Sequence, residues 1–206
     1  MAHNQTIYFV SKSEKKLLEM RKLWTNGTYS LESYNMEIQE IQNSDIVEIA
    51  KKKAKEAYGQ IFRPVLVEHS GLVLPNYGNL PGGLTQIVWD SLTDNGTQPN
   101  KFGEVFAPHG ETPAIAQSVL VYCDGRRFLV SDGAVQGVIV KNSRGNNGFG
   151  WDGLFQPDDD AEGRTFAEMD DSTKSYFSMR TRAMKDFLKK LTDRSDAEVN
   201  YNGYEY

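Results

Sequence analysis

The sequence predicts an α/β protein built around a mixed β-sheet, and three observations support this fold class. Near the N-terminus, a buried strand is followed by a short polar turn and an amphipathic helix, which is how an α/β unit opens. Two longer apolar runs flank Asp124-Gly125, a dipeptide that favours a tight hairpin between antiparallel strands. The last long segment has helical periodicity, so strands and helices alternate along the chain.

The first half of the chain predicts two strands and two helices. Residues Ile7–Ser11 form a buried strand, and Glu14–Thr25 form a helix with one apolar face. A second helix runs from about Asp45 to Tyr58, opens with an N-terminal capping pair, and carries Lys53 within its apolar stripe. Pro64–Val67 is a short strand that follows this helix.

The second half predicts a hairpin and a final helix. A long loop rich in Gly, Pro and Asn runs through Gly83, and strands follow later at Ala114–Tyr122 and Arg127–Val140. The last long helix covers roughly Ser172–Leu191. Because no repeat or low-complexity linker interrupts the chain, we expect one domain over residues 1–194 and a polar, loosely ordered tail over residues 195–206.

Composition narrows the class of function. With 39% hydrophobic and 25% charged residues, the 206-residue chain is typical of a soluble globular protein. Its formal net charge of -5 argues against sequence-independent binding to a nucleic-acid polymer, so an anionic ligand must meet local lysines. The single cysteine, Cys123, excludes an internal disulfide and fits a reducing compartment. Because the chain has neither a bilayer-length apolar run nor a secretory signal, we expect a cytoplasmic protein without a membrane partner.

The segment GFGWDGLFQP at residues 148–157 is the most informative motif. Its glycines, Gly150 among them, permit a tight loop that presents Phe149 and Trp151, two aromatic side chains suited to gripping a planar base. The carboxylate of Asp152 can accept hydrogen bonds from ring N–H groups. The alternative is an ordinary hairpin whose aromatic side chains anchor the core.

The turn SKSEKK at residues 11–16 is a candidate phosphate site. The hydroxyls of Ser11 and Ser13 and the ammonium group of Lys16 gather where a strand ends and helix N–H groups point outward, which favours an anion. The glycines of a P-loop are missing, so a solvated basic helix start is the alternative.

The segment VEHSG at residues 67–71 places Glu68, His69 and Ser70 at a predicted strand end, where open α/β sheets bind ligands. Paired with Glu40, Glu68 could hold Mg²⁺ through oxygen ligands, and His69 could act as a base. The alternative is that His69 caps the strand and that Glu68 is solvated.

In order and spacing, these segments resemble the inosine triphosphate pyrophosphatases, which hydrolyse non-standard purine nucleoside triphosphates to monophosphate and pyrophosphate. The resemblance extends from Ser11 to about Phe187, and its most specific block is FGWD, then FQP, then TFAEM at residues 165–169. It implies an elongated mixed β-sheet flanked by helices, two lobes with a central nucleotide cleft, Mg²⁺ as cofactor, and a homodimer.

The resemblance also implies a role for each site residue. Glu40 and Glu68 would hold Mg²⁺, and His69 would orient or deprotonate the attacking water. Lys16 and Lys53 would neutralise the phosphates. The remaining substrate-binding residues, with Phe149 and Trp151 enclosing the base and Arg180 donating to a ring carbonyl, would be Ser11, Ser13, Ser70, Phe149, Gly150, Trp151, Asp152, Lys174, Ser178, Met179 and Arg180.

Three residues depart from the family pattern: Ser13 replaces a loop asparagine, His69 replaces an acid, and Met179 replaces a base-reading histidine. Each change touches the chemistry of the site. Besides a non-standard purine triphosphate pyrophosphatase, the sequence therefore permits a divergent enzyme for another modified nucleotide, or a nucleotide-binding protein without turnover.

Overall fold

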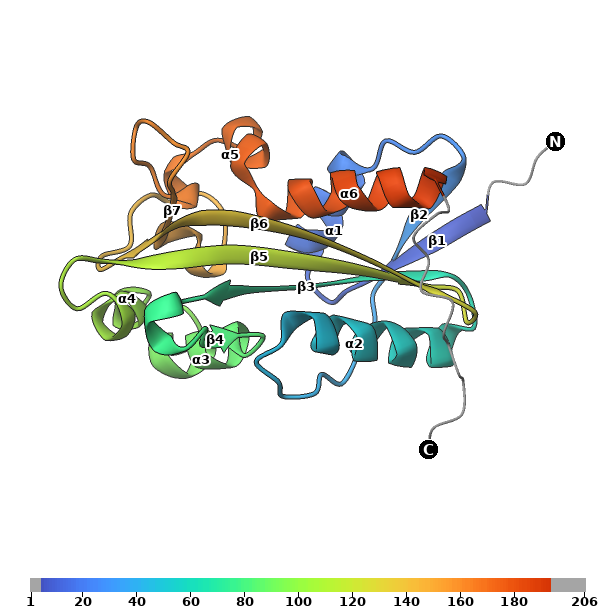
Figure 1. The fold of residues 1–206 in the computed structure, drawn as a ribbon, viewed down its shortest axis with the longest axis horizontal. Helices are drawn as coiled ribbons and strands as arrows, with labels where there is room; N and C mark the ends of the chain where they lie inside the picture. Colours follow the sequence, from blue (N-terminus) through green and yellow to red (C-terminus); the bar gives the residue numbers. More distant parts are fainter. Residues whose placement is uncertain (1–4, 194–206) are drawn as a thin grey trace.

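The computed structural model describes residues 5–193 and places their strands in one seven-stranded sheet (Figure 1). These strands are Gln5–Val10 (β1), Tyr29–Tyr34 (β2), Val65–Val73 (β3), Pro81–Gly82 (β4), Glu111–Cys123 (β5), Phe128–Val140 (β6) and Phe155–Pro157 (β7). The strand order is β2-β1-β3-β5-β6-β7, and β4 pairs with β3 outside this path. Because β1 is parallel to β2 and β3 while the remaining pairs are antiparallel, the predicted mixed sheet is confirmed.

Helices enclose the sheet from both faces (Figure 1). The α-helices of the described chain are Glu14–Leu23 (α1), Ile46–Ile61 (α2), Thr85–Thr93 (α3), Asn100–Phe106 (α4), Asp171–Phe177 (α5) and Met179–Asp193 (α6). Helices α1 and α6 cover one face and α2 covers the other, whereas α3 and α4 pack in a third cluster that includes Leu72 of β3 and Phe155 of β7. Along β1 and the first half of β3, the sheet therefore separates two hydrophobic layers.

The side chains of β3 alternate between these two layers, as the pleat of a strand requires. Leu66 packs in the cluster formed with α1 and α6, whereas Val65 and Val67 pack with α2. The same alternation directs Glu68 toward α1 and α6 and His69 toward α2. Two adjacent residues of the VEHSG segment thus lie on opposite faces of the sheet.

One edge of β3 is open between its two neighbours. On this edge β1 pairs with residues 65–66 and β4 with residues 72–73. Within residues 5–193, no strand pairs with residues 67–71 on this side, although β5 pairs along the whole opposite edge. The carbonyl of Glu68 accepts a 3.4 Å hydrogen bond from the side chain of Lys53 there. Side chains from both faces of the sheet can therefore meet around this edge.

The predicted strands and helices are found, with two corrections. The strand predicted to end at Val67 continues to Val73, because buried partners compensate the charge of Glu68. The single helix predicted over Ser172–Leu191 is wrong at Ser178, where the chain breaks into α5 and α6 and the Ser178 hydroxyl accepts the N–H of Arg180. Strands β2, β4 and β7 and helices α3 and α4 were not predicted. The predicted tail lies outside the described residues.

Candidate active site

Two adjoining cavities gather most of the predicted site residues. A cleft of about 760 Å³ lies between the start of α1, helix α3 and residues 143–153. A cavity of about 110 Å³ adjoins it and reaches His69. Together they are lined by the predicted residues Ser11, Ser13, Lys16, Glu40, Lys53, His69, Ser70, Phe149, Gly150, Trp151, Asp152, Met179 and Arg180. Lys174 and Ser178 line a separate cavity of about 70 Å³ between α1 and α5.

The start of α1 brings the predicted phosphate turn to the cleft. The hydroxyl of Ser13 caps α1 by accepting the N–H of Lys16 at 3.4 Å, and the hydroxyl of Ser11 accepts the N–H of Ser13 at 3.1 Å. These bonds order the turn and place its lysines beside a helix N-terminus, an arrangement that favours an anion. Phosphate binding at this turn remains a prediction.

Glu68 is the centre of a buried ion network on the α1 and α6 side of the sheet. Its Oε2 lies 2.7 Å from the Nζ of Lys16, and its Oε1 accepts from Ser118 at 2.9 Å and from Arg180 at 3.2 Å. Burial by itself raises the pKa of Glu68, but the charges of Lys16 and Arg180 and the hydrogen bonds from Lys16 and Ser118 hold that pKa well below its usual range. Glu68 is therefore ionised at neutral pH.

Glu40, Lys53 and His69 form a second cluster on the α2 side. The Nζ of Lys53 lies 2.5 Å from Oε1 of Glu40, and Oε2 of Glu40 lies 3.5 Å from Nδ1 of His69. The Nε2 of His69 is 2.9 Å from the carbonyl of Gly83. Burial lowers the pKa of His69, against the opposing effect of Glu40, so the ring is neutral at neutral pH. A carbonyl can only accept, so Nε2 carries the proton and Nδ1 keeps its lone pair.

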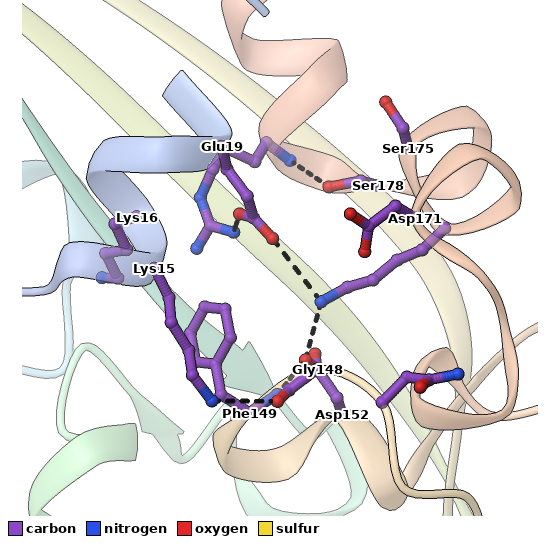
Figure 2. A network of polar contacts seen from close by, with 12 residues as sticks. Lys15, Lys16, Glu19, Gly148, Phe149, Asp152, Asp171, Ser175 and Ser178 are labelled. Carbon is purple, nitrogen blue, oxygen red and sulfur yellow. Dashed lines mark hydrogen bonds and ion pairs between the residues drawn. The ribbon is translucent and has the colours of Figure 1, made fainter. Parts of the chain in front are cut away.

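The loop of residues 148–153 presents an aromatic ring to three cations. The Nζ atoms of Lys15 and Lys174 lie 5.4 and 5.1 Å from the ring centroid of Phe149, and the guanidinium of Arg180 lies 5.8 Å from it. Asp152 orders this loop, because its Oδ2 accepts from the backbone N–H of Phe149 and from Lys174, each at 2.7 Å (Figure 2). The aromatic face and the cations thus form one wall of the site.

Glu19 connects Arg180, which was predicted to donate to a ring carbonyl, with Lys174, which was predicted to bind substrate. Its carboxylate forms an ion pair with Arg180, and its Oε1 lies 3.7 Å from the Nζ of Lys174 (Figure 2). In this structure Arg180 therefore holds Glu19 and Glu68, and Lys174 holds Asp152 and Glu19. A base that contacts Arg180 and Lys174 has to compete with these carboxylates.

Trp151 and Met179 belong to the core as well as to the site. The ring of Trp151 makes an edge contact with Phe155 at 5.9 Å between centroids, and both Trp151 and Met179 pack in the cluster around β7. Both also line the 110 Å³ cavity. The alternative prediction, in which the loop's aromatic side chains anchor the core, thus applies to Trp151, whereas Phe149 faces the cations.

The Ham1 family profile matches residues 7–190, a span that runs from β1 into α6. The chain belongs to the Ham1 family. It is 32% identical to the dITP/XTP pyrophosphatase of Saccharolobus solfataricus, covering 92% of this chain and 95% of that protein. It is also 32% identical to inosine triphosphate pyrophosphatase 1 of Trypanosoma cruzi, covering 88% and 89% respectively.

Solved structures show the same fold. A HAM1 protein from Coxiella burnetii superimposes with a TM-score of 0.75 at 25% identity, covering 92% of this chain and 99% of that one. The resemblance of the sequence motifs to the inosine triphosphate pyrophosphatases is therefore confirmed at the level of the Ham1 family. Within residues 5–193, no helix combines the length and the apolar character that crossing a bilayer requires.

Two residues of this Ham1 family site were missed by sequence reasoning. Ser118 lies on β5 and donates to Glu68 from 50 residues away, and no local pattern marks it. Glu19 lies on α1 beyond the SKSEKK turn, and no local pattern predicts its contacts with α5 and α6. Ser118 faces the same side of the sheet as Glu68, across the β3–β5 ladder. This can be deduced only once the register between the two strands is known.

Proposed function

We propose that this protein hydrolyses non-standard purine nucleoside triphosphates, such as ITP, dITP and XTP, at the α–β bond to nucleoside monophosphate and pyrophosphate. The observation that carries the proposal is the convergence of cleft lysines, acidic side chains and the Phe149 loop in adjoining cavities. The names of the relatives from Saccharolobus solfataricus and Trypanosoma cruzi support it. A homodimer is the assembly that the resemblance implies.

Lys16 and Lys53 are the residues proposed to bind the triphosphate. Both line the 760 Å³ cleft, and both are paired with carboxylates, Lys16 with Glu68 and Lys53 with Glu40. Burial lowers the pKa of Lys16, although Glu68 partly offsets this effect. A phosphate would replace the carboxylate partner of each lysine, which frees Glu40 and Glu68 for a cation.

The acidic residues fit a divalent cation that arrives with its nucleotide. Oε2 of Glu68 is buried beside the ammonium group of Lys16, and Glu40 lines both cavities. Residues 5–193 hold no cluster of three or more acidic, histidine or cysteine side chains that could form a cage by themselves. Mg²⁺ commonly binds through one or two carboxylates plus phosphate oxygens, so Glu40 and Glu68 suit it. A bound cation would stabilise charge on the phosphates.

The residues around the Phe149 loop are proposed to select the base. The ring of Phe149 offers a stacking face, and Lys174 and Arg180 offer donors that a 6-oxo purine can accept. Adenine carries an amino group, a hydrogen-bond donor, at the same position. Its donor would therefore face the donors of Lys174 and Arg180. The neighbouring carboxylates of Asp152 and Glu19 hold both cations in place before a base binds.

The reaction class is tested by its products. With ITP and a divalent cation, we expect pyrophosphate and IMP in equal amounts, because water opens the α–β anhydride and the electron pair of the broken P–O bond leaves with pyrophosphate. Release is followed by phosphorus NMR without added phosphatase. Orthophosphate as the first product, or tight ITP binding with no product, would contradict the proposal.

Met179 is expected to relax discrimination between bases. Met179→His adds a buried donor, and one such bond is worth about 1–3 kcal/mol of discrimination. We therefore expect the ratio of kcat/KM for ITP over ATP to rise roughly 5- to 150-fold. Met179→Leu, which conserves size without a donor, is the matched control. An equal ratio in the histidine variant and in the control would show that residue 179 does not contact the base.

A further inference from the structure

His69 carries a hydrogen bond that is characteristic of a metal-binding imidazole. Its Nε2 donates to the carbonyl of Gly83 at 2.9 Å, which fixes the orientation of the ring in a site where its side chain is buried. Metal-binding histidines almost always donate their second ring nitrogen to a carboxylate, a backbone carbonyl or water in this way. The remaining nitrogen, Nδ1, is the one available to a ligand.

Nδ1 of His69 faces a carboxylate oxygen across a gap that a cation can fill. Its neighbour, Oε2 of Glu40, lies 3.5 Å away. This separation is longer than the roughly 2.7–3.2 Å of an N–H···O hydrogen bond. Two ligands about 2.1 Å from one ion and at right angles to each other are about 3 Å apart. A small rotation of the half-exposed Glu40 side chain would bring both atoms to that separation.

The lining of the cavities separates this pair from Glu68. Glu40 and His69 both line the 110 Å³ cavity together with Lys16, whereas Glu68 lines neither cavity of the site. The cause is the alternation of β3, which directs His69 toward α2 and Glu68 toward α1 and α6. Before a phosphate displaces Lys16 from Glu68, the donors that line the cavity are therefore one carboxylate and one imidazole.

We propose that Nδ1 of His69 and Oε2 of Glu40 bind the catalytic cation together, and that this mixed donor pair favours a first-row transition-metal ion over Mg²⁺. Imidazole nitrogen is a good ligand for transition ions and a poor one for Mg²⁺, which prefers oxygen. The inference rests on the proposed function only for the phosphate that accompanies the cation. In this inference His69 is a metal ligand. The alternative outcome of the tests is that His69 acts as a general base.

The first test uses Mn²⁺ and pyrophosphate, without any purine, on the full chain. We expect the electron spin-echo spectrum of bound Mn²⁺ to show coupling to an imidazole nitrogen in the wild type and in the control variants His3→Gln and His109→Gln. His69→Asp should bind Mn²⁺ without that coupling. This experiment contains no nucleotide. Its result can therefore be interpreted even if the protein does not hydrolyse purine nucleoside triphosphates.

The second test compares affinities by calorimetry in the same pyrophosphate buffer. The preference for Co²⁺ over Mg²⁺ is expected to be at least tenfold larger in the wild type than in His69→Asp, whose carboxylate suits the harder ion. A wild-type spectrum without nitrogen coupling overturns the proposal, whether or not the variant folds. An equal metal preference in both proteins also overturns it and leaves His69 to act on the water.

Discussion

Glu68→Gln is expected to reduce kcat/KM for ITP by about a hundredfold or more, because the carboxylate is a proposed cation ligand and also holds Lys16. The same change should lower the free energy of unfolding by about 3 kcal/mol, since removing one partner of a buried ion network leaves the other charges uncompensated. In this variant Lys16 loses the carboxylate of Glu68, and Arg180 keeps only that of Glu19. Activity with ITP and urea denaturation measure the two effects.

The pH dependence of this stability loss follows from the depressed pKa of Glu68. A carboxyl whose folded pKa lies below its unfolded value stabilises the fold fully above the unfolded value, about 4.3 for glutamate, and loses this contribution as the pH falls toward the folded pKa. The difference in unfolding free energy between wild type and Glu68→Gln should therefore be constant above about pH 5 and should shrink below pH 4.

A matched control separates the buried network from a general charge effect. Glu111→Gln makes the same chemical change at the exposed start of β5 and should alter neither activity nor stability measurably. Full activity in a folded Glu68→Gln protein would show that Glu68 is not a ligand of the cation. A stability difference that persists unchanged at pH 3 would show that the charge of Glu68 is not its source.

Much of the fold could be predicted because its local signals agree with its packing. The apolar stripe of α2 and the capping residue Asp45 both mark a helix that is present, and Lys53 in that stripe reaches the site. Strand β2 was missed because all of its residues are partly or fully exposed, so it lacks a continuous apolar run. Periodicity alone also could not detect the break at Ser178, since apolar positions continue across it.

The arrangement of the site could be predicted only in part, because its contacts are long-range. The motifs identified most of the residues that line the two cavities, but not which carboxylate each cation holds. Glu68 and His69 were grouped as neighbours at a strand end, whereas the strand continues and its pleat places them on opposite faces. Arg180 was predicted to read a base, and in this structure it binds Glu19 and Glu68. Pairs more than 100 residues apart leave no local pattern.

Asp152→Asn is expected to separate the stability of the Phe149 loop from recognition of the base. Asp152 is buried and binds both the N–H of Phe149 and the ammonium group of Lys174. The amide can still accept one hydrogen bond but no longer neutralises Lys174, so we expect a loss of about 3 kcal/mol in unfolding free energy. The exposed change Asp158→Asn is the control and should have no measurable effect on stability.

The double variant Asp152→Asn with Lys174→Met completes the test, because it removes both charges of the pair. Unfolding free energy should then recover most of the loss, since no uncompensated charge remains buried. Recognition should not recover, because the donor proposed for the 6-oxo group is gone, and kcat/KM for ITP should stay about tenfold or more below wild type. Recovery of both quantities would show that Lys174 and Asp152 serve only to hold the loop. Recovery of neither would show that the N–H of Phe149, and not the ion pair, is the contact that matters.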